Sequence, residues 1–337
     1  MSKRIDAARS RFSITPFMSE IPAKPATGIH GVMVVRNEWD VIAFNLLHHL
    51  RLGLDRIHVV DNGSTDGTEA LLETMSRMGP VSVTRHDGPF EQKRITNELA
   101  QTALAQGAKW IVPIDADEFW DPGSRKLATI FRRCKDEEPG QRVAVQNYFV
   151  PMSERSPRLS CALHARWVTV ETLEQSKTNR EDARDGRIPV SLLEPLHKCF
   201  FRADRGLLIE QGGHRWEGMS RKSKFAADLI IHHLPHRHQQ KTEERRKAGE
   251  RILASPDYVL GNSWHLTRLV SMNAMQLASE WMASSVHRGE LRHGDRRFAM
   301  REDDSLYRLL HPLRKAAKKI HREAGVSPRL RWFGTRW

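Results

Sequence analysis

The stretch that decides the fold is Trp110–Ile114, with the sequence WIVPI, followed at once by Asp115–Trp120, with the sequence DADEFW. The apolar run predicts a buried strand, which delivers two carboxylates, two residues apart, where it ends. Ionised aspartate is rarely buried without a partner, so acids at this position need a cation or a cleft. Ligands of open α/β sheets bind at the carboxyl ends of strands, and carboxylates together with substrate phosphates suit Mg²⁺ or Mn²⁺. The stretch therefore predicts a metal–diphosphate site.

Strands and helices alternate along the residues before this stretch. Apolar side chains at four-residue spacing, such as Ile42, Leu46 and Leu50, predict helices between short apolar strands. The predicted strands cover residues 31–35, 56–60, 81–85 and 110–114, and the last helix between them covers 91–106. This order implies right-handed βαβ units and an α/β fold with a mostly parallel central sheet flanked by helices. Polar loops are then expected along one edge of the sheet, at residues 36–38, 61–66 and 115–120.

Residues beyond 120 carry weaker patterns. Strands are expected at 141–150, 197–202, 205–209 and 226–233, and a charged loop at 172–187. Helix-forming residues dominate from residue 239 onward. We expect a flexible basic segment over 1–27, one α/β domain over 28–238 and a basic helical C-terminal extension over 239–337.

The charge of the chain suits a polyanionic partner. The 337 residues carry a formal net charge of +13, with a pI of about 10.0. This excess fits nucleic acid, an anionic membrane surface or a phosphorylated substrate, or it serves only to solvate the surface. Cys134, Cys161 and Cys199 form no CxxC pair, which favours a reducing compartment. No apolar run approaches the roughly 18 residues of a spanning helix, and no secretory signal is apparent, so we expect a cytoplasmic protein.

The acids after the fourth strand can act together. Side chains i and i+2 of an extended strand share a face, so Asp115 and Asp117 can look into one cleft while Ala116 points away. One acid can hold a metal, and the other the ribose of a nucleotide or a metal-bound water. Glu118 is expected to face the opposite side. It can either act in the site or form an ion pair with a nearby Lys or Arg, and the sequence favours neither role.

Polar residues also end the first two strands. The carboxylate of Asp61 can accept hydrogen bonds from a base or a ribose, or it can cap the turn that follows. The same alternatives apply to Asn37 and Glu38 at the end of the first strand.

Histidines in the second half are candidate metal ligands. His214 lies in a flexible glycine loop beside Trp216 and can complete a metal shell with Asp117, or it can be a surface residue. The histidine-rich run over 232–238 matches no closed zinc signature, and we expect at most one of its histidines in the site.

Other chemistries lack their motifs. The turn over 63–67 has neither the G-x-G-x-x-G fingerprint nor the P-loop lysine, and no G-x-S-x-G nucleophile elbow occurs. A nucleotidyltransferase on a similar sheet remains an alternative, but it would open with a glycine-rich basic loop, which residues 36–38 are not. A basic nucleic-acid-binding protein is the second alternative. It would need stacking aromatics among clustered basic residues, whereas the loops at the predicted sheet edge are acidic.

Three motifs, in this order and spacing, resemble glycosyltransferases of the family 2 type with the GT-A fold. They are VVRNE ending at Glu38, VVDNGSTDG ending at Gly67 and WIVPIDADEF ending at Phe119. The Asp-Ala-Asp-Glu-Phe form is most similar to the subgroup related to family 92. Further segments resembling that subgroup are Lys198–Arg202, Gly213–His214 and, within 233–241, His233, Arg237 and Lys241.

The resemblance implies a nucleotide-sugar donor (a UDP- or GDP-sugar), a divalent metal (Mn²⁺ or Mg²⁺) and an acceptor hydroxyl on a glycan or a lipid-linked molecule. It also implies an inverting transfer, which we place in cell-surface polysaccharide synthesis. By the same resemblance, Asp115 and Asp117 form a DXD motif and His214 completes the metal shell. The nucleotide pocket would be lined by Asn37, Glu38, Asp61 and Asp115.

The sequence departs from the family 2 pattern at the catalytic base. No Glu-Asp motif stands at the expected place, and Glu181 lies in the charged loop. Glu217, next to Trp216, is our candidate for the carboxylate that takes the proton from the acceptor. The metal would act as a Lewis acid on the leaving diphosphate, assisted by cations such as Arg94 or Lys198.

The C-terminal region carries a basic amphipathic pattern. Apolar residues from Leu306 to Ile320 recur at three-and-four spacing, and Lys and Arg flank them, with Pro312 as a point of kinking. Such a helix can lie on the anionic inner face of a membrane, or it can pack on the domain with its charges in solvent.

Overall fold

The computed structural model describes residues 27–134, 139–220, 223–255, 258–259 and 263–328. The basic segment expected over 1–27 therefore lies, apart from Thr27, outside the described residues.

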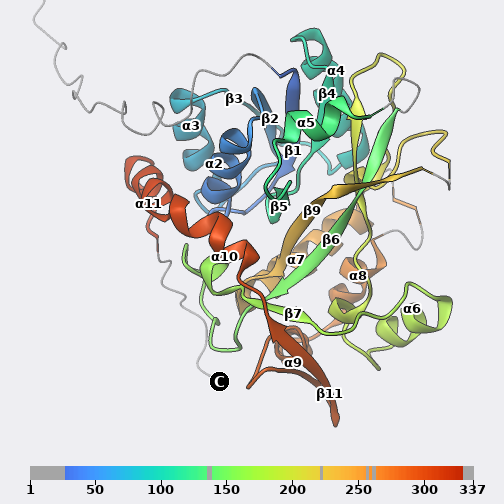
Figure 1. Cartoon of the computed structure of the whole chain (residues 1–337). Helices are drawn as coiled ribbons and strands as arrows, with labels where there is room; N and C mark the ends of the chain where they lie inside the picture. The colour runs from blue at the N-terminus through green and yellow to red at the C-terminus, as the bar shows by residue number, and fades with distance from the viewer. Residues whose placement is uncertain (1–26, 135–138, 221–222, 256–257, 260–262, 329–337) are drawn as a thin grey trace, which may run out of the picture.

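Strands β1 to β4 form the parallel part of an 11-stranded sheet. β1 (Ile29–Val35) lies between β2 (Arg56–Asp61) and β4 (Trp110–Pro113), and β3 (Val81–Arg85) follows β2. The connecting helices are α2 (Ile42–Leu52), α3 (Thr68–Met78) and α4 (Gln92–Ala105) (Figure 1). The expected strand–helix alternation and the α/β class are confirmed.

The rest of the sheet is largely antiparallel. β8 (Lys198–Arg202) joins β4, and β6 (Gly140–Phe149), β7 (Trp167–Thr169), β11 (Arg296–Glu302) and β10 (Glu290–His293) continue outward. β9 (Phe225–His236) pairs in parallel with β6 and antiparallel with β5 (Glu118–Asp121). The pairing of Glu118 with His233 places the histidine-rich strand beside the acidic segment after β4.

Both faces of the parallel strands are covered by apolar helix faces. On one face, Ile42, Leu46 and Leu50 of α2 are buried in a core shared with α3. On the other face, Ile95 and Leu99 of α4 pack in a second core. Each such side chain contributes about 1.5–3 kcal/mol when fully buried. The predicted apolar faces of both helices are therefore confirmed.

Shorter elements connect the strands of the second half. They are α5 (Leu127–Arg132), α6 (Lys177–Arg184) and the 3₁₀ turns η1 (Cys161–His164), η2 (Val190–Leu192), η3 (Gln211–Gly213) and η4 (Arg268–Ser271). The expected charged loop at 172–187 thus contains a helix, because Ser176 caps it by accepting a hydrogen bond from the Asn179 amide at 3.2 Å. The strand expected at 205–209 is a turn instead, in which the Gly206 amide donates to Asp204 Oδ1 at 2.7 Å.

The region after residue 239 contains a hairpin besides the expected helices. The helices are α7 (Gln239–Leu253), α8 (Trp264–Thr267), α9 (Ala274–Ala283), α10 (Ser305–Leu310) and α11 (Arg314–Glu323), with the 3₁₀ turn η5 (His311–Leu313) before α11. The hairpin β10–β11 forms because Leu291, Phe298 and Met300 pack in one apolar cluster. Gly294 supplies the positive φ of 56° in its turn.

α10 and α11 pack their apolar face on the domain. Pro312 interrupts the helix within η5, and His321 of α11 contacts the ring of Trp39, with 5.8 Å between the ring centroids. The side chains buried in the core shared with α2 and α3 are Leu306, Leu310, Leu313, Ala317 and Ile320. Of the two interpretations of this basic helix, the structure shows the packing of its apolar face on the domain, and contact with an anionic membrane stays a prediction. Within the described ranges, no helix has the length and apolar character needed to span a bilayer.

Candidate active site

A cleft of about 920 Å³ opens at the carboxyl ends of β1 and β4. The loop after β1, the segment after β4 and the loop after β8 all contribute to its lining. Five residues predicted for the site line it, namely Glu38, Asp115, Asp117, His214 and Glu217. Asn37 and Asp61 do not line it.

The segment from Asp115 to Glu118 is a turn, not an extended strand. The Glu118 amide donates to the Asp115 carbonyl at 3.0 Å, so side chains do not alternate between two faces here. Asp115, Ala116, Asp117 and Glu118 all line the cleft, which corrects the expectation that Ala116 and Glu118 point away. The buried amide of Asn45 on α2 fixes the turn by donating to three of its carbonyls, those of Asp115, Ala116 and Glu118, at 3.1, 3.0 and 2.8 Å.

Lys198 of β8 is the partner of two acids in this turn. Its Nζ lies 2.5 Å from Asp115 Oδ2 and 3.3 Å from Glu118 Oε1, and the side chain is 2% exposed. Burial alone would lower the pKa of Lys198, but the charges of Asp115 and Glu118 raise it above its usual value. Burial raises the pKa of Glu118 to about 7. Lys198 therefore stays cationic at the cleft wall, and Glu118 is ion-paired, one of the two roles left open for it.

Asp117 is surrounded by cations from β9 and the loop that follows it. Its Oδ2 lies 3.7 Å from His233 Nε2 and 3.7 Å from Arg237 Nη1. Burial acts to raise the pKa of Asp117, but the charges of His233 and Arg237 hold the pKa below its usual value. Asp117 is therefore ionised at neutral pH.

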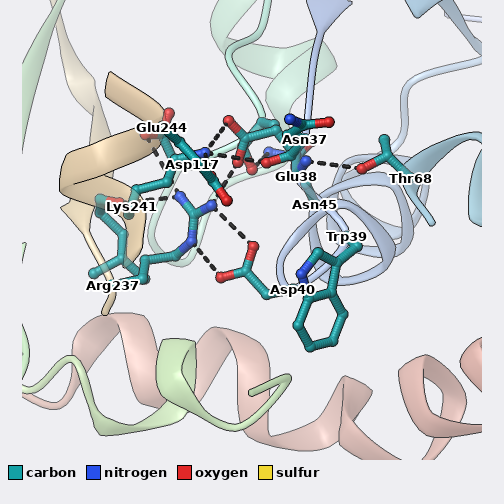
Figure 2. Close-up of polar contacts among 12 residues, drawn as sticks. Asn37, Glu38, Trp39, Asp40, Asn45, Thr68, Asp117, Arg237, Lys241 and Glu244 are labelled. Carbon is teal, nitrogen blue, oxygen red and sulfur yellow. Dashed lines mark hydrogen bonds and ion pairs between the residues drawn. The ribbon is translucent and has the colours of Figure 1, made fainter. Parts of the chain in front are cut away.

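Arg237 lies at the centre of a buried charge cluster (Figure 2). Its guanidinium donates to both carboxylate oxygens of Asp40, from Nε at 2.8 Å and from Nη2 at 3.0 Å, and Nη2 also donates to Glu38 Oε2 at 2.5 Å. Lys241 of α7 donates to the other oxygen of Glu38 at 2.6 Å. The cluster thus ties the loop after β1 to the loop after β9 and to Asp117.

Asn37 and Asp61 organise the loops behind the cleft. Asn37 has a positive φ of 55°, and its Oδ1 accepts a hydrogen bond from the Thr65 amide at 2.8 Å. Asp61 Oδ1 accepts from the amide and the hydroxyl of Ser64 at 3.0 and 2.5 Å, so it caps the turn after β2. Its other oxygen is buried, accepts no hydrogen bond from the described residues and lies 3.9 Å from Arg85 Nη1.

His214 presents one ring nitrogen to the cleft. Its Nδ1 donates to the carbonyl of His197 at 2.7 Å, which leaves Nε2 with the lone pair. Burial, with a smaller contribution from the charge of Lys198, lowers the pKa of His214 to about 4. The imidazole is therefore neutral at pH 7, as a metal ligand must be.

The donor types fit a divalent ion, but they are not gathered around a single point. Asp115 and Asp117 offer carboxylate oxygens and His214 offers a neutral nitrogen, and all three line the same cleft. Among the described residues, no three His, Cys, Asp or Glu side chains lie close enough together to hold a metal ion. In this structure Asp115 Oδ2 pairs with Lys198.

Glu217 is exposed at the rim of the cleft. Its backbone amide donates to the Leu208 carbonyl at 2.9 Å. Its carboxylate makes no ion pair or hydrogen bond within the described part of the chain, so it is free to meet an incoming hydroxyl group.

Sequence reasoning missed several residues of this site. Asn45 was detectable, because it is an amide on the apolar stripe of α2. The role of Asp40 could not be predicted from the residues around it, because its partner Arg237 is distant in the sequence. Two histidines of the 232–238 run, His233 and His236, line the cleft, where at most one was expected.

Comparisons with known proteins agree with the motifs. Residues 32–185 match the family model described as Glycosyl transferase family 2. A glycosyltransferase family 92 protein of Oryza sativa subsp. japonica is 31% identical over 102 residues, which span 29% of this chain and 17% of the rice protein.

Two solved structures match much of this chain with low identity and low TM-scores. The mannosyltransferase PcManGT from Pyrobaculum calidifontis, in complex with GDP-Man and Mn²⁺, matches over 92% of both chains with 13% identity and a TM-score of 0.36. Residues 1–349 of S. aureus TarS match over 76% of this chain and 71% of that chain, with 15% identity and a TM-score of 0.32. The match to the glycosyl transferase family 2 model thus falls on the part of the chain that contains the parallel strands and the acidic turn after β4, and the chain spans less than a fifth of the length of its rice relative.

Proposed function

We propose that the chain transfers a sugar from a UDP- or GDP-sugar to a hydroxyl group of a glycan or a lipid-linked acceptor, with Mn²⁺ or Mg²⁺ as cofactor. The observation that carries the proposal is that Asp115 and Asp117 line one cleft together with Lys198. Its volume of about 920 Å³ lies in the upper range of small-molecule sites, which suits a donor and an acceptor sugar together.

The donor would lie along the carboxyl ends of β1, β2 and β4. Asp61 does not line the cleft, but its Oδ2 accepts no hydrogen bond among the described residues, which supports a role as acceptor for a base or ribose donor group. Asn37 and Glu38 hold the adjoining loop in place through their hydrogen bonds. We infer that these residues form the nucleotide side of the site, as the family resemblance implies.

Asp115, Asp117 and His214 would hold the divalent ion. When bound, the ion would supply Lewis-acid neutralisation of the charge on the departing diphosphate. Lys198 would add a second positive charge beside the diphosphate, because its ammonium group already lies at the cleft wall next to Asp115. The ammonium group would then stabilise the diphosphate oxygens directly.

Glu217 would remove the proton from the acceptor hydroxyl. Its carboxylate is exposed on the rim and has no competing partner among the described residues. Attack by the activated oxygen from the face opposite the diphosphate would invert the anomeric carbon. We further propose that the product belongs to cell-surface polysaccharide and that transfer occurs on the cytoplasmic side of the membrane.

The variant Glu217→Gln is expected to lower kcat by about 10²–10⁴-fold, the usual contribution of general-base catalysis. Donor binding should not change, because the amide keeps the size of the side chain. The matched control is Glu210→Gln, which also lies on the cleft wall but is ion-paired with Lys93 at 3.0 Å. Equal rates for the Glu217 variant and the control would assign the base to another residue.

Thermal stability in the presence of candidate donors tests the proposed function. A nucleotide sugar at about one hundred times its Kd should stabilise the fold by about 2.7 kcal/mol. We expect this increase with a UDP- or GDP-sugar only when Mn²⁺ or Mg²⁺ is present, and its loss when EDTA is added. Stabilisation that persists in EDTA would contradict the proposed need for a metal but would still support the proposed donor class. No stabilisation and no transfer with any UDP- or GDP-sugar would contradict the proposed donor class.

A further inference from the structure

The outer side of α10 and α11 carries a row of exposed cations. The two helices lie along one outer side of the molecule (Figure 1). Their apolar side chains face the core, so the basic ones face solvent. We call the following five exposed side chains the basic stripe: Arg308, Arg314, Lys315, Lys318 and Arg322.

The basic stripe lacks counter-charges. None of its five cations forms an ion pair with an acid in the described ranges, and Arg308 donates only to the Ser305 hydroxyl, at 3.3 Å. Some exposed cations on other helices are paired, for example Arg94 with Glu91 at 2.7 Å. Like charges three or four residues apart on a helix repel each other, so an unpaired row is mildly unfavourable unless an anionic partner neutralises it.

A small basic cavity lies at one end of the stripe. Its volume is about 280 Å³, and its lining residues are Ser160, Leu163, His164, Arg166, Tyr307, His311 and Arg314. Arg166 is held over the ring of Tyr307, 4.0 Å from its centroid, and pairs with Asp304 at 3.0 Å. Arg314, which belongs to the stripe, supplies a guanidinium that forms no ion pair with any acid that the structure describes. His164 Nδ1 is paired with Glu154 at 2.8 Å, so the donors left around the cavity are the Ser160 hydroxyl, the His311 imidazole and the Arg314 guanidinium, which suit a phosphate group.

The sequence after α11 has the composition of a membrane interface. Residues 329–337 read RLRWFGTRW and contain three arginines, two tryptophans and one phenylalanine. Tryptophan and basic residues are enriched where proteins meet lipid headgroups. This composition continues the charge of the stripe and adds amphipathic aromatic groups.

We propose that the basic stripe docks the protein on an anionic phospholipid surface and that the cavity at its end receives a lipid phosphate. The contact is peripheral, because the apolar face of α11 is occupied by the core. A membrane fits better than nucleic acid, because the stripe has no exposed aromatic ring for base stacking and the ring of Tyr307 is covered by Arg166. The proposal does not depend on the donor or the metal.

Co-sedimentation of the full chain with vesicles tests the docking. We expect binding to phosphatidylcholine vesicles that contain phosphatidylglycerol, weaker binding as salt is raised, and none to phosphatidylcholine alone. Each basic residue near an anionic surface strengthens binding roughly fivefold, so replacing four should weaken it by roughly several hundredfold. The test variant changes Arg314, Lys315, Lys318 and Arg322 to Gln.

The control variant removes the same charge from other surfaces. It changes four exposed cations outside the stripe to Gln, namely Lys126, Arg132, Arg205 and Lys247. All eight side chains are exposed, so both variants should keep the unfolding temperature of the parent. Equal vesicle binding by the two variants would overturn the proposal, as would stronger binding of the parent to oligonucleotides than to anionic vesicles.

Single variants test the cavity. Arg314→Gln affects both the stripe and the cavity, whereas Arg322→Gln affects the stripe alone. We expect the Arg314 variant to lose more affinity for phosphatidylglycerol vesicles. Equal losses would overturn the phosphate-binding role of the cavity. A chain ending at residue 328 should retain the salt-sensitive part of the binding, and complete loss of binding in that chain would overturn docking through the stripe.

Discussion

Replacing Arg237 with methionine should destabilise the fold by about 3–5 kcal/mol, the usual result of removing one partner from a buried ionic cluster. The guanidinium is completely buried and is the common partner of Asp40, Glu38 and Asp117. Without it, the ion-pair partner that Asp40 keeps within the described part of the chain is His238, whose Nε2 lies 3.2 Å from Asp40 Oδ2. The loss follows from leaving carboxylates buried without sufficient counter-charge, not from the volume of the side chain.

Urea unfolding measures this effect. The control is Arg246→Met on α7, because Arg246 pairs with Glu243 and Glu250 at the surface, where a pair contributes about 1 kcal/mol or less. Arg237→Lys should recover part of the stability, since it restores the charge but not the two-pronged contact with Asp40. A loss for Arg237→Met no larger than that of the control would show that the cluster does not hold the loops together.

The variant Asp117→Asn should lower sugar transfer about a thousandfold, which corresponds to about 4 kcal/mol of transition-state stabilisation. Asparagine keeps the shape of the side chain but removes the charge that the proposed metal site requires. The fold should remain, because Arg237 keeps its contacts with Asp40 and Glu38. Steady-state kinetics with the donor identified by thermal stabilisation measures the effect.

The control for this variant is Asp228→Asn. Asp228 lies on β9, outside the cleft lining, and pairs with Arg125 at 3.2 Å. The Asp228→Asn variant should have the same turnover and stability as the parent protein. Parental turnover in Asp117→Asn would remove the case for its role in transfer. Loss of both fold and turnover would instead make Asp117 a structural partner of Arg237.

The first half of the fold could be predicted from the sequence because its signals are local. The apolar runs that became β1 to β4 and the periodic faces of α2 and α4 lie within single short segments. The position of Asp115 and Asp117 could be predicted for the same reason, because the end of a strand is marked by the residues directly before and after it. Asp115 and Asp117 therefore line the cleft as expected, although the turn that carries them was read as extended strand.

The charge cluster and the later strands could not be predicted in the same way. Asp40 and Arg237 are separated by 197 residues, and nothing near either one indicates the other. The pairing of β9 with both β5 and β6 is likewise a long-range event. The hairpin β10–β11 carries a glycine turn signal at Gly294, but its charged outer face hides the apolar alternation.

The contact between Trp39 and His321 has a consequence for synthesis of the chain. The loop that follows β1 packs against α11, so this contact can form only after the residues up to His321 have left the ribosome. A nascent chain can form the early strands and helices before then. The segment with Glu38 and Asp40, however, still lacks its later partners Arg237 and Lys241. The final packing of this loop thereby depends on a segment that is synthesised long after it.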